Sequence, residues 1–267
     1  MNANNPLKEL SISEILSLTF NLYRSKFKQF FLPFLIQGII IGIFSYTITS
    51  TFPIPETPII PTSPTSTTYY EELIPWVFTL ISTIIVIGIL LGLITWIVGT
   101  ITTGIIVKNA SDQIEKDTSD LGVSFNSAIS KLPSLLPAQF MAGILIAIGM
   151  FFFIVPGIIF AIMFSLVIPI IIIEQRGVFE SLGRSKKLVN KRWLNIFLLG
   201  LIIGIISIIA TGIAIVLNIP FSNIHPIVNP LLTNITLAFV GPISIIAATY
   251  LYYSMVAREN PQTVENT

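Results

Sequence analysis

The sequence predicts an all-α, polytopic membrane helical bundle of six transmembrane helices with cytoplasmic amphipathic interfacial helices. Three observations carry this prediction. Of the 267 residues, 53% are hydrophobic and only 10% are charged, whereas about 25% of the residues of a soluble domain are charged. Four long stretches of the chain contain no charged residue. All 14 lysines and arginines fall on one side of the predicted membrane topology, as the positive-inside rule requires.

The uncharged stretches set the number of spans. They cover residues 29–55, 73–107, 132–173 and 193–257. About 20 apolar helical residues cross a bilayer core, so the first two stretches hold one span each and the last two hold two each. A turn signal at Val155-Pro156-Gly157 and a proline- and asparagine-rich segment from Asn218 to Pro230 divide the longer ones. We expect helices over residues 29–48, 75–106, 135–154, 157–174, 193–217 and 231–256.

The topology follows from the basic residues. With the N-terminus inside, the outer loops are 49–74, the turn near 156, and 218–230, and none of them contains lysine or arginine. We therefore expect both termini in the cytoplasm and the protein in the plasma membrane. Residues 1–257 then form a single six-helix membrane domain, the outer loop 49–74 is rich in Pro, Thr and Ser, and residues 258–267 form a short cytoplasmic tail.

The second span is longer than a bilayer requires. Trp76 and Trp96 are 20 residues apart, about 30 Å along a helix, so they can occupy the two aromatic belts. Residues 97–107 then protrude into the cytoplasm or meet the interfacial helices. Strong tilt of the helix is the competing explanation.

An amphipathic segment precedes the first, third and fifth spans. The first has Ile12, Ile15 and Leu16 at helical spacing, and Ser11 with Glu14 forms a capping-box pattern. Helices of this kind lie at the membrane surface with the apolar face towards the bilayer. The arrangement suggests three repeats, each an interfacial helix followed by a transmembrane hairpin. Similar composition of apolar helices is the alternative explanation.

The third amphipathic segment carries the richest basic cluster. As a functional site it would contact an anionic lipid or an acidic partner, since each basic residue near an anionic leaflet contributes about 1 kcal/mol. Plain topological anchoring is the alternative, and we consider it the commoner use of such a cluster. The candidate contact residues are Arg184, Lys186, Lys187, Lys191 and Arg192.

The sequence contains no recognisable set of catalytic residues. The chain has no cysteine, a single histidine, His225, and no Asp in any predicted span. No Walker A or Gly-x-Gly-x-x-Gly sequence is present. We expect no catalytic, metal or cofactor-binding residue and no cofactor. A net charge of +1 gives no reason to expect a nucleic-acid partner.

The predicted membrane interior is neutral, whereas ion-coupled transporters usually place charged groups there. Its polar groups ordinarily form hydrogen bonds between helices, and a path for a neutral solute is the alternative. Three glycine pairs, Gly38/Gly42, Gly88/Gly92 and Gly200/Gly204, allow close helix approach within one chain or between subunits of an oligomer. The polar residues at depth are Gln37, Ser82, Thr95, Gln139, Ser165, Ser207, Thr211, Asn234, Thr236 and Ser244.

Several short motifs along the chain are Ser11-Ile12-Ser13-Glu14-Ile15-Leu16, Asn21-Leu22-Tyr23-Arg24, Val155-Pro156-Gly157-Ile158, Glu180-Ser181-Leu182 and Lys191-Arg192-Trp193. They resemble motifs of a prokaryotic membrane family, the membrane domain attached to some glycerophosphoryl diester phosphodiesterases, with its stand-alone YciC-like relatives. The resemblance implies a multi-helical integral membrane protein, but the catalytic phosphodiesterase domain is lacking, so no such activity is carried over. The Ile- and Thr-rich composition points to an archaeal source.

The function expected from these features is that of a non-enzymatic, multi-pass membrane component. Its role is structural, lipid-organising or partner-binding, and its partners are membrane lipids and other membrane or cytoplasmic proteins. The alternative is a transporter or permease subunit for an uncharged or lipid-like solute, which the prolines near the spans and the polar groups at depth would serve.

Single-cysteine variants test the topology without background, because the chain has no cysteine of its own. We expect Lys26→Cys and Lys187→Cys to react with a membrane-impermeant maleimide only after cells are opened. Glu56→Cys, in the outer loop, is the control that reacts in intact cells. Labelling of position 26 or 187 from the exterior of intact cells would overturn the topology.

Overall fold

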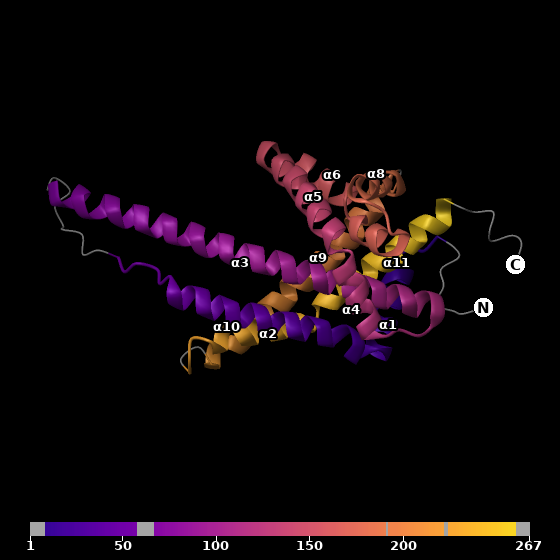
Figure 1. Ribbon diagram of the computed structural model, residues 1–267, viewed down its shortest axis with the longest axis horizontal. Coiled ribbons are helices and arrows are strands. Elements are labelled where there is room, and N and C mark those ends of the chain that lie inside the picture. The colour runs from indigo at the N-terminus through magenta and orange to yellow at the C-terminus, as the bar shows by residue number, and fades with distance from the viewer. Residues whose placement is uncertain (1–8, 58–66, 191, 222–223, 260–267) are drawn as a thin grey trace, which may run out of the picture.

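The computed structural model describes residues 9–57, 67–190, 192–221 and 224–259, and these residues form helices and no strands (Figure 1). In chain order the elements are α1 (Ile12–Ser25), α2 (Phe27–Thr51), α3 (Thr67–Lys116), α4 (Leu121–Ser130), α5 (Leu132–Phe152), α6 (Ile154–Met163), α7 (Val167–Pro169), the π-helix η1 (Ile170–Glu174), α8 (Val178–Val189), α9 (Trp193–Asn218), the 3-10 turn η2 (Ile219–Phe221), α10 (Val228–Ala238) and α11 (Gly241–Glu259).

Six segments of the described chain are long and apolar enough to cross a bilayer, in agreement with the predicted number, and they are compatible with a multi-pass membrane protein. Each of the short helices α1, α4 and α8 precedes two of these segments. A common origin of the three units stays a prediction. The six segments are Phe27–Thr51, Leu73–Lys116, Leu132–Phe152, Ile154–Glu174, Trp193–Phe221 and Val228–Glu259.

The boundary between the third and fourth spans differs from the prediction. The chain is extended at Phe153 (φ −158°, ψ 145°), whereas the predicted turn residues Val155, Pro156 and Gly157 already belong to α6. Proline fits the first turn of a helix, because the backbone N–H that it lacks has no intrahelical acceptor there. The turn signal therefore marked a helix start rather than the turn itself.

The fourth span is interrupted, although the sequence predicts one helix over 157–174. Its α-helix ends at Met163 and resumes after Leu166, and Pro169 lies at the junction with η1. Ser185 of α8 supplies the missing hydrogen bonds. Its Oγ donates to the Met163 carbonyl oxygen at 2.7 Å and accepts from the Leu166 N–H at 3.3 Å. A side chain from another helix thus satisfies backbone groups that the break leaves free.

The sixth span is interrupted in a similar way. It consists of α10 and α11, which are separated at Phe239–Val240 before Gly241 and Pro242. The hydroxyl group of Tyr23, on α1, donates to the Phe239 carbonyl oxygen at 2.8 Å. The predicted helix over 231–256 is therefore two helices, and the preceding loop is shorter than expected because α10 begins at Val228.

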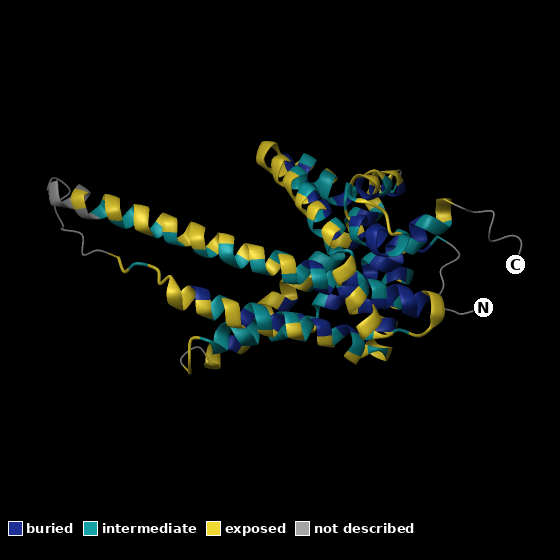
Figure 2. Cartoon of the chain, viewed as in Figure 1, coloured by how far each residue is buried: buried dark blue, intermediate teal, exposed yellow. Residues whose placement is uncertain are grey.

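The second span forms one continuous helix of 50 residues, α3, and residues 67–74 of the predicted outer loop belong to it. Figures 1 and 2 show its N-terminal part extending away from the other helices, and its most apolar stretch has no buried residue. The C-terminal part is buried from Ile105 to Val107 and from Asn109 to Ile114. It meets α4 as expected, since an added Cβ at Gly104 would lie 3.0 Å from Cβ of Ala128.

The buried core gathers at the end of the bundle where α1, α4 and α8 meet the C-terminal parts of α3 and α11 (Figure 2). The described basic residues lie at this end as well, in these short helices or beside them. The Leu10 N–H donates to Ser254 Oγ at 2.8 Å, which joins the start of the described chain to α11. The one-sided charge of the sequence therefore corresponds to one end of the molecule.

The three amphipathic helices use their apolar faces differently. Leu182, Leu188 and Val189 of α8 are buried within the protein. In α4, by contrast, Val123 and Phe125 are 55% and 48% exposed. The apolar face that the sequence assigns to the bilayer is therefore largely packed on the bundle in α8, and it is left open in α4.

The glycine pairs also separate into two classes. An added Cβ at Gly38 would lie 3.0 Å from the carbonyl oxygen of Asn234, and one at Gly42 would lie 2.7 Å from Cδ2 of Leu231. These glycines let α2 approach α10 closely within one chain. At the pairs Gly88/Gly92 and Gly200/Gly204, no atom of the described residues lies within 4 Å of an added Cβ.

We expect Gly38→Val to lower the stability of the protein by about 1–3 kcal/mol, because the larger side chain pushes against the backbone of α10. Gly88→Val is the matched control, since its side chain enters open space. The measurement is reversible unfolding of the purified protein in mixed micelles. Equal shifts for the two variants would contradict the close packing of α2 on α10.

Candidate functional site

The predicted basic cluster is largely neutralised by carboxylates. Arg184 lies between two of them, with Nε 3.1 Å from Oε1 of Glu174 and Nη1 2.5 Å from Oε2 of Glu259. The ammonium of Lys187 is 3.0 Å from Oε1 of Glu259. Arg192 forms an ion pair with Glu9, and Lys191 lies outside the described residues.

Arg184 joins three segments of the chain. Its side chain is 14% exposed, and its two carboxylates come from η1 and from the end of α11. Burial alone would lower the pKa of Arg184, but the hydrogen bonds with Glu259 and Glu174 and their charges outweigh it and raise the pKa above its usual value. The hydroxyl group of Tyr252 also donates to Glu174 Oε1, at 3.1 Å. Arg184 is therefore engaged inside the protein.

Lys186 is the member of the cluster that stays free within the described part of the chain. It is exposed, it forms no ion pair there, and it lines a crevice of about 300 Å³ between α6 and the α8–α9 junction. Trp193, at the edge of this crevice, is 59% exposed. The other lining residues are Ile159, Ile162, Met163, Val189 and Asn190. The crevice combines one cation with an apolar wall.

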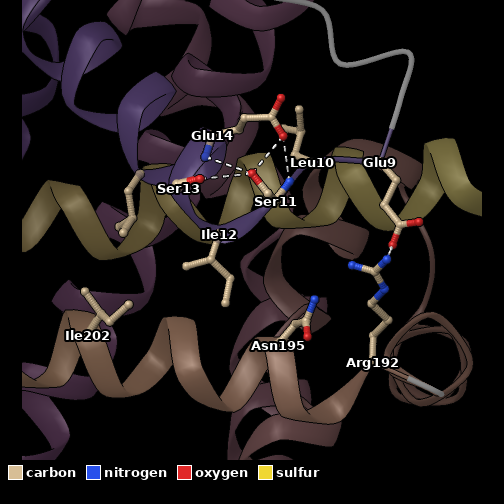
Figure 3. Close-up of a pocket in the computed structure, with 10 residues that line it drawn as sticks. Glu9, Leu10, Ser11, Ile12, Ser13, Glu14, Arg192, Asn195 and Ile202 are labelled. Atoms are coloured by element: carbon tan, nitrogen blue, oxygen red, sulfur yellow. Dashed lines mark hydrogen bonds and ion pairs between the residues drawn. The ribbon is translucent and has the colours of Figure 1, made fainter.

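A groove of about 750 Å³ opens between the start of α1 and the start of α9 (Figure 3). Ser11 Oγ accepts from the Glu14 N–H, and a Glu14 carboxylate oxygen accepts from the Ser11 N–H at 2.8 Å, so the predicted capping box is present. Figure 3 shows Arg192 directed at Glu9 across one end of the groove. With its cation paired and two carboxylates beside it, the groove offers no site for an anion.

A polar cavity of about 450 Å³ lies between α2, α3, α9, α10 and the break that precedes α11. It brings together five of the neutral polar residues predicted at depth, from four different helices. No charged residue lines it. Its polar lining residues are Gln37, Thr95, Ser207, Thr211 and Asn234, and its apolar lining includes Phe34, Ile41, Ala210, Leu237, Ala238 and Val240.

Three polar residues of this cavity donate within their own helices. Ser207 donates to the Ile203 carbonyl oxygen and Thr211 to the Ser207 carbonyl oxygen, both at 2.9 Å. The Asn234 amide donates to the Pro230 carbonyl oxygen at 2.8 Å. Within the described part of the chain, Gln37 Oε1 is buried and has no hydrogen-bond partner. The side-chain oxygens of these four residues therefore remain as acceptors in a lining that is otherwise mostly apolar.

A second, apolar cavity of about 420 Å³ lies on the α4 side of the contact between α2 and α3, and Gln37 lines it too. The other lining residues are Leu32, Pro33, Ile36, Ile40, Val98, Ile101, Thr102, Ile105, Leu121, Gly122 and Phe125. Gln37 thus borders the cavity that contains the five polar residues on one side and an almost wholly apolar cavity on the other.

The remaining polar residues at depth do not reach the polar cavity. Gln139 accepts from the Thr100 hydroxyl at 3.0 Å and so joins α5 to α3, as the sequence predicts for such groups. The other four donate to carbonyl oxygens of their own turns: Ser82, Ser165, Thr236 and Ser244. The residue type alone did not distinguish the residues that line the cavity from those that join two helices or bond within their own turn.

One polar cluster was missed by the sequence reasoning. Gln113 is buried in α3 and donates to Gln29 Oε1 at 3.2 Å and to Ser119 Oγ at 2.8 Å. Buried Asp112 lies 2.8 Å from the Lys108 ammonium and 3.1 Å from that of Lys116. The spacing of four residues between Lys108, Asp112 and Lys116 was a visible signal for these ion pairs, because side chains four residues apart meet on one face of a helix.

His225 lies in the loop between η2 and α10. Its Nδ1 accepts from the Ile227 N–H at 3.3 Å, and its ring centroid is 5.6 Å from that of Tyr46. Among the described residues, no group of three His, Asp or Glu side chains could hold a metal ion.

We expect Arg184→Gln to lower stability by roughly 2 kcal/mol, because it leaves the carboxylates of Glu174 and Glu259 without their shared cation in a partly buried site. Lys187→Gln is the control and should cost less than about 0.5 kcal/mol, since Lys187 is 72% exposed although it pairs with the same Glu259. Unfolding of both variants in micelles measures the difference. Equal losses would show that Arg184 is an ordinary surface residue.

Comparison with known proteins gives a family but no activity. No curated protein and no solved structure matches the chain. Residues 67–257, which include α3 to α10 and nearly all of α11, match the family described as Domain of unknown function (DUF7847). The residues of the Lys186 crevice lie within the matched region, as do those that α3, α9 and α10 contribute to the polar cavity. The chain therefore belongs to the DUF7847 family.

Proposed function

We propose that this protein is a non-enzymatic, multi-pass component of a prokaryotic, archaeal plasma membrane that organises lipids, with both termini in the cytoplasm. Its ligand at the cytoplasmic end is an anionic phospholipid bound at the Lys186 crevice. The observation that carries the proposal is an exposed lysine without an ion-pair partner in the described chain, placed beside an apolar crevice and an exposed tryptophan.

Each part of such a lipid has a counterpart in the crevice. The Lys186 ammonium and the Asn190 amide offer hydrogen-bond donors to a phosphate group. Ile159, Ile162 and Met163 offer an apolar wall to a hydrocarbon chain of the lipid. Tryptophan is enriched at the level of the lipid headgroups, where Trp193 would lie in the proposed topology.

The other residues of the basic cluster contribute less to lipid binding in this proposal. Arg184, Lys187 and Arg192 already pair with carboxylates of the same chain. A lipid phosphate would have to compete with those carboxylates. Lys186 can bind a phosphate without breaking an ion pair of the described chain.

Fluorescence quenching tests the proposal in reconstituted protein. In a Trp76→Phe/Trp96→Phe background, Trp193 is the sole fluorophore among the three tryptophans of the chain. In phosphatidylcholine nanodiscs, brominated phosphatidylglycerol should quench it at lower mole fraction than brominated phosphatidylcholine. We expect Lys186→Gln to reduce this preference about fivefold, since one basic residue contributes about 1 kcal/mol at an anionic surface.

Lys187→Gln is the matched control, because it removes the same charge from the neighbouring position and should change the preference less than twofold. Lys186→Arg should retain the preference. Equal quenching by the two brominated lipids in the protein with an unmodified crevice would refute the proposed function. An equal loss of the preference for phosphatidylglycerol in Lys186→Gln and Lys187→Gln would assign that preference to general surface charge.

A transporter or permease subunit for an uncharged or lipid-like solute is the second candidate, and the polar cavity favours it. The cavity lies between spans at mid-length and has no charged lining residue. Flux of an uncharged solute across vesicles that contain the protein separates this function from lipid organisation alone. The resemblance to the phosphodiesterase-associated membrane domain supports a membrane domain of the same kind, and it implies no phosphodiesterase activity.

A further inference from the structure

From the polar cavity we infer a second ligand site, which takes an uncharged lipid that bears hydroxyl groups, such as a monoacylglycerol or a long-chain alcohol. This site is separate from the Lys186 crevice and does not depend on lipid binding there. It deepens the second candidate function, because it names the ligand class of the cavity that favours that function. Its lining comes from α2, α3, α9 and α10 together with the break before α11, so only the folded bundle creates it.

The charge of the ligand follows from the absence of charged side chains among the lining residues. An ionised group placed there would lose its hydration without gaining an opposite charge. The cost of such a group in a membrane interior is several kcal/mol. The site therefore discriminates against phosphate-bearing and ammonium-bearing lipids.

The ligand needs a group that donates hydrogen bonds, because several acceptors of the cavity are free. Ser207, Thr211 and Asn234 each donate to a backbone carbonyl oxygen, so their side-chain oxygens remain as acceptors. Gln37 Oε1 is a further acceptor, buried and without a partner in the described chain. A ligand hydroxyl group can donate to such oxygens and can also accept from the amide N–H groups of Gln37 and Asn234, whereas an ester or ether oxygen can only accept.

The hydrocarbon part of the ligand has space on either side of Gln37. Phe34, Ile41 and Leu237 contribute apolar lining to the polar cavity itself. The apolar cavity of about 420 Å³ adjoins the same Gln37 side chain. A hydroxyl group near Gln37 thus leaves the chain of the ligand against apolar surface, as lipid-like chemistry requires.

Photolabelling of the purified full-length protein in phosphatidylcholine nanodiscs tests this inference. The probe is a 1-monoacylglycerol with a diazirine in its acyl chain. The comparison probe is the methyl ester of the same fatty acid, which has no hydroxyl group. We expect the monoacylglycerol to label residues that line either cavity at least about five times more efficiently, as the loss of a hydrogen bond predicts.

Two threonines form the matched pair of variants. Thr211→Val removes a hydroxyl group that lines the cavity, and Thr236→Val removes one that donates to its own helix outside it. Gln37→Leu removes the unpaired acceptor. We expect Gln37→Leu and Thr211→Val to reduce labelling several-fold and Thr236→Val to leave it unchanged, with thermal unfolding confirming that each variant is folded.

Equal labelling by the two probes, or equal effects of Thr211→Val and Thr236→Val, would overturn the inference. If Gln37→Leu fails to fold, the threonine pair still decides the result. Labelling confined to Ile159, Met163 or Trp193 would also overturn it, because the probe would then occupy the Lys186 crevice. The brominated-lipid experiment is independent, so either site can fail while the other stands.

Discussion

The structure depends on the need to satisfy every backbone hydrogen-bonding group in an apolar interior. A broken helix leaves carbonyl and N–H groups unpaired, and hydrocarbon offers no replacement. Two spans of this protein are broken, and in each case a helix outside the spans supplies a hydroxyl group. Ser185 of α8 bonds the Met163 carbonyl and the Leu166 N–H, and Tyr23 of α1 bonds the Phe239 carbonyl. The short amphipathic helices therefore complete the bundle.

This role explains how α1 and α8 are packed. If they had only to float at the membrane surface, their apolar faces would be left towards lipid. Instead, the face of α8 with Leu182, Ser185 and Val189 is buried against the protein, and Arg184 ties the same helix to η1 and α11. The basic residues of α8 are held in fixed positions as a result. That is why one of them, Lys186, can face an apolar crevice while its neighbours pair with carboxylates.

The neutral interior has a different consequence. Away from the basic end, where the lining of the spans is neutral, the helices are held together by close packing and by hydrogen bonds, such as the contact of Gly38 with the backbone of α10 and the bond between Thr100 and Gln139. The breaks and the uneven packing leave a cavity at mid-length of the spans. Its lining combines apolar side chains with neutral amide and hydroxyl groups, which suits uncharged ligands and disfavours ions. The proposed ligand of this cavity and the proposed lipid at the crevice differ for this reason.

Sequence by itself determined the all-helical class, the six apolar segments and the gathering of basic residues at one end. The length of each apolar stretch and the positions of the charges can be read directly from the order of residues along the chain. It also predicted the capping box of Ser11 and Glu14, which is a contact between near neighbours. It placed the turn between the third and fourth spans at Val155-Pro156-Gly157, whereas the chain turns at Phe153. It also treated two broken spans as continuous, since a break is stable only if a distant side chain, here Ser185 or Tyr23, satisfies it. Tertiary structure alone decided which of the ten polar residues face one cavity and which residue of the predicted basic cluster stays free of ion pairs in the described chain, because both depend on contacts between helices that no local pattern records.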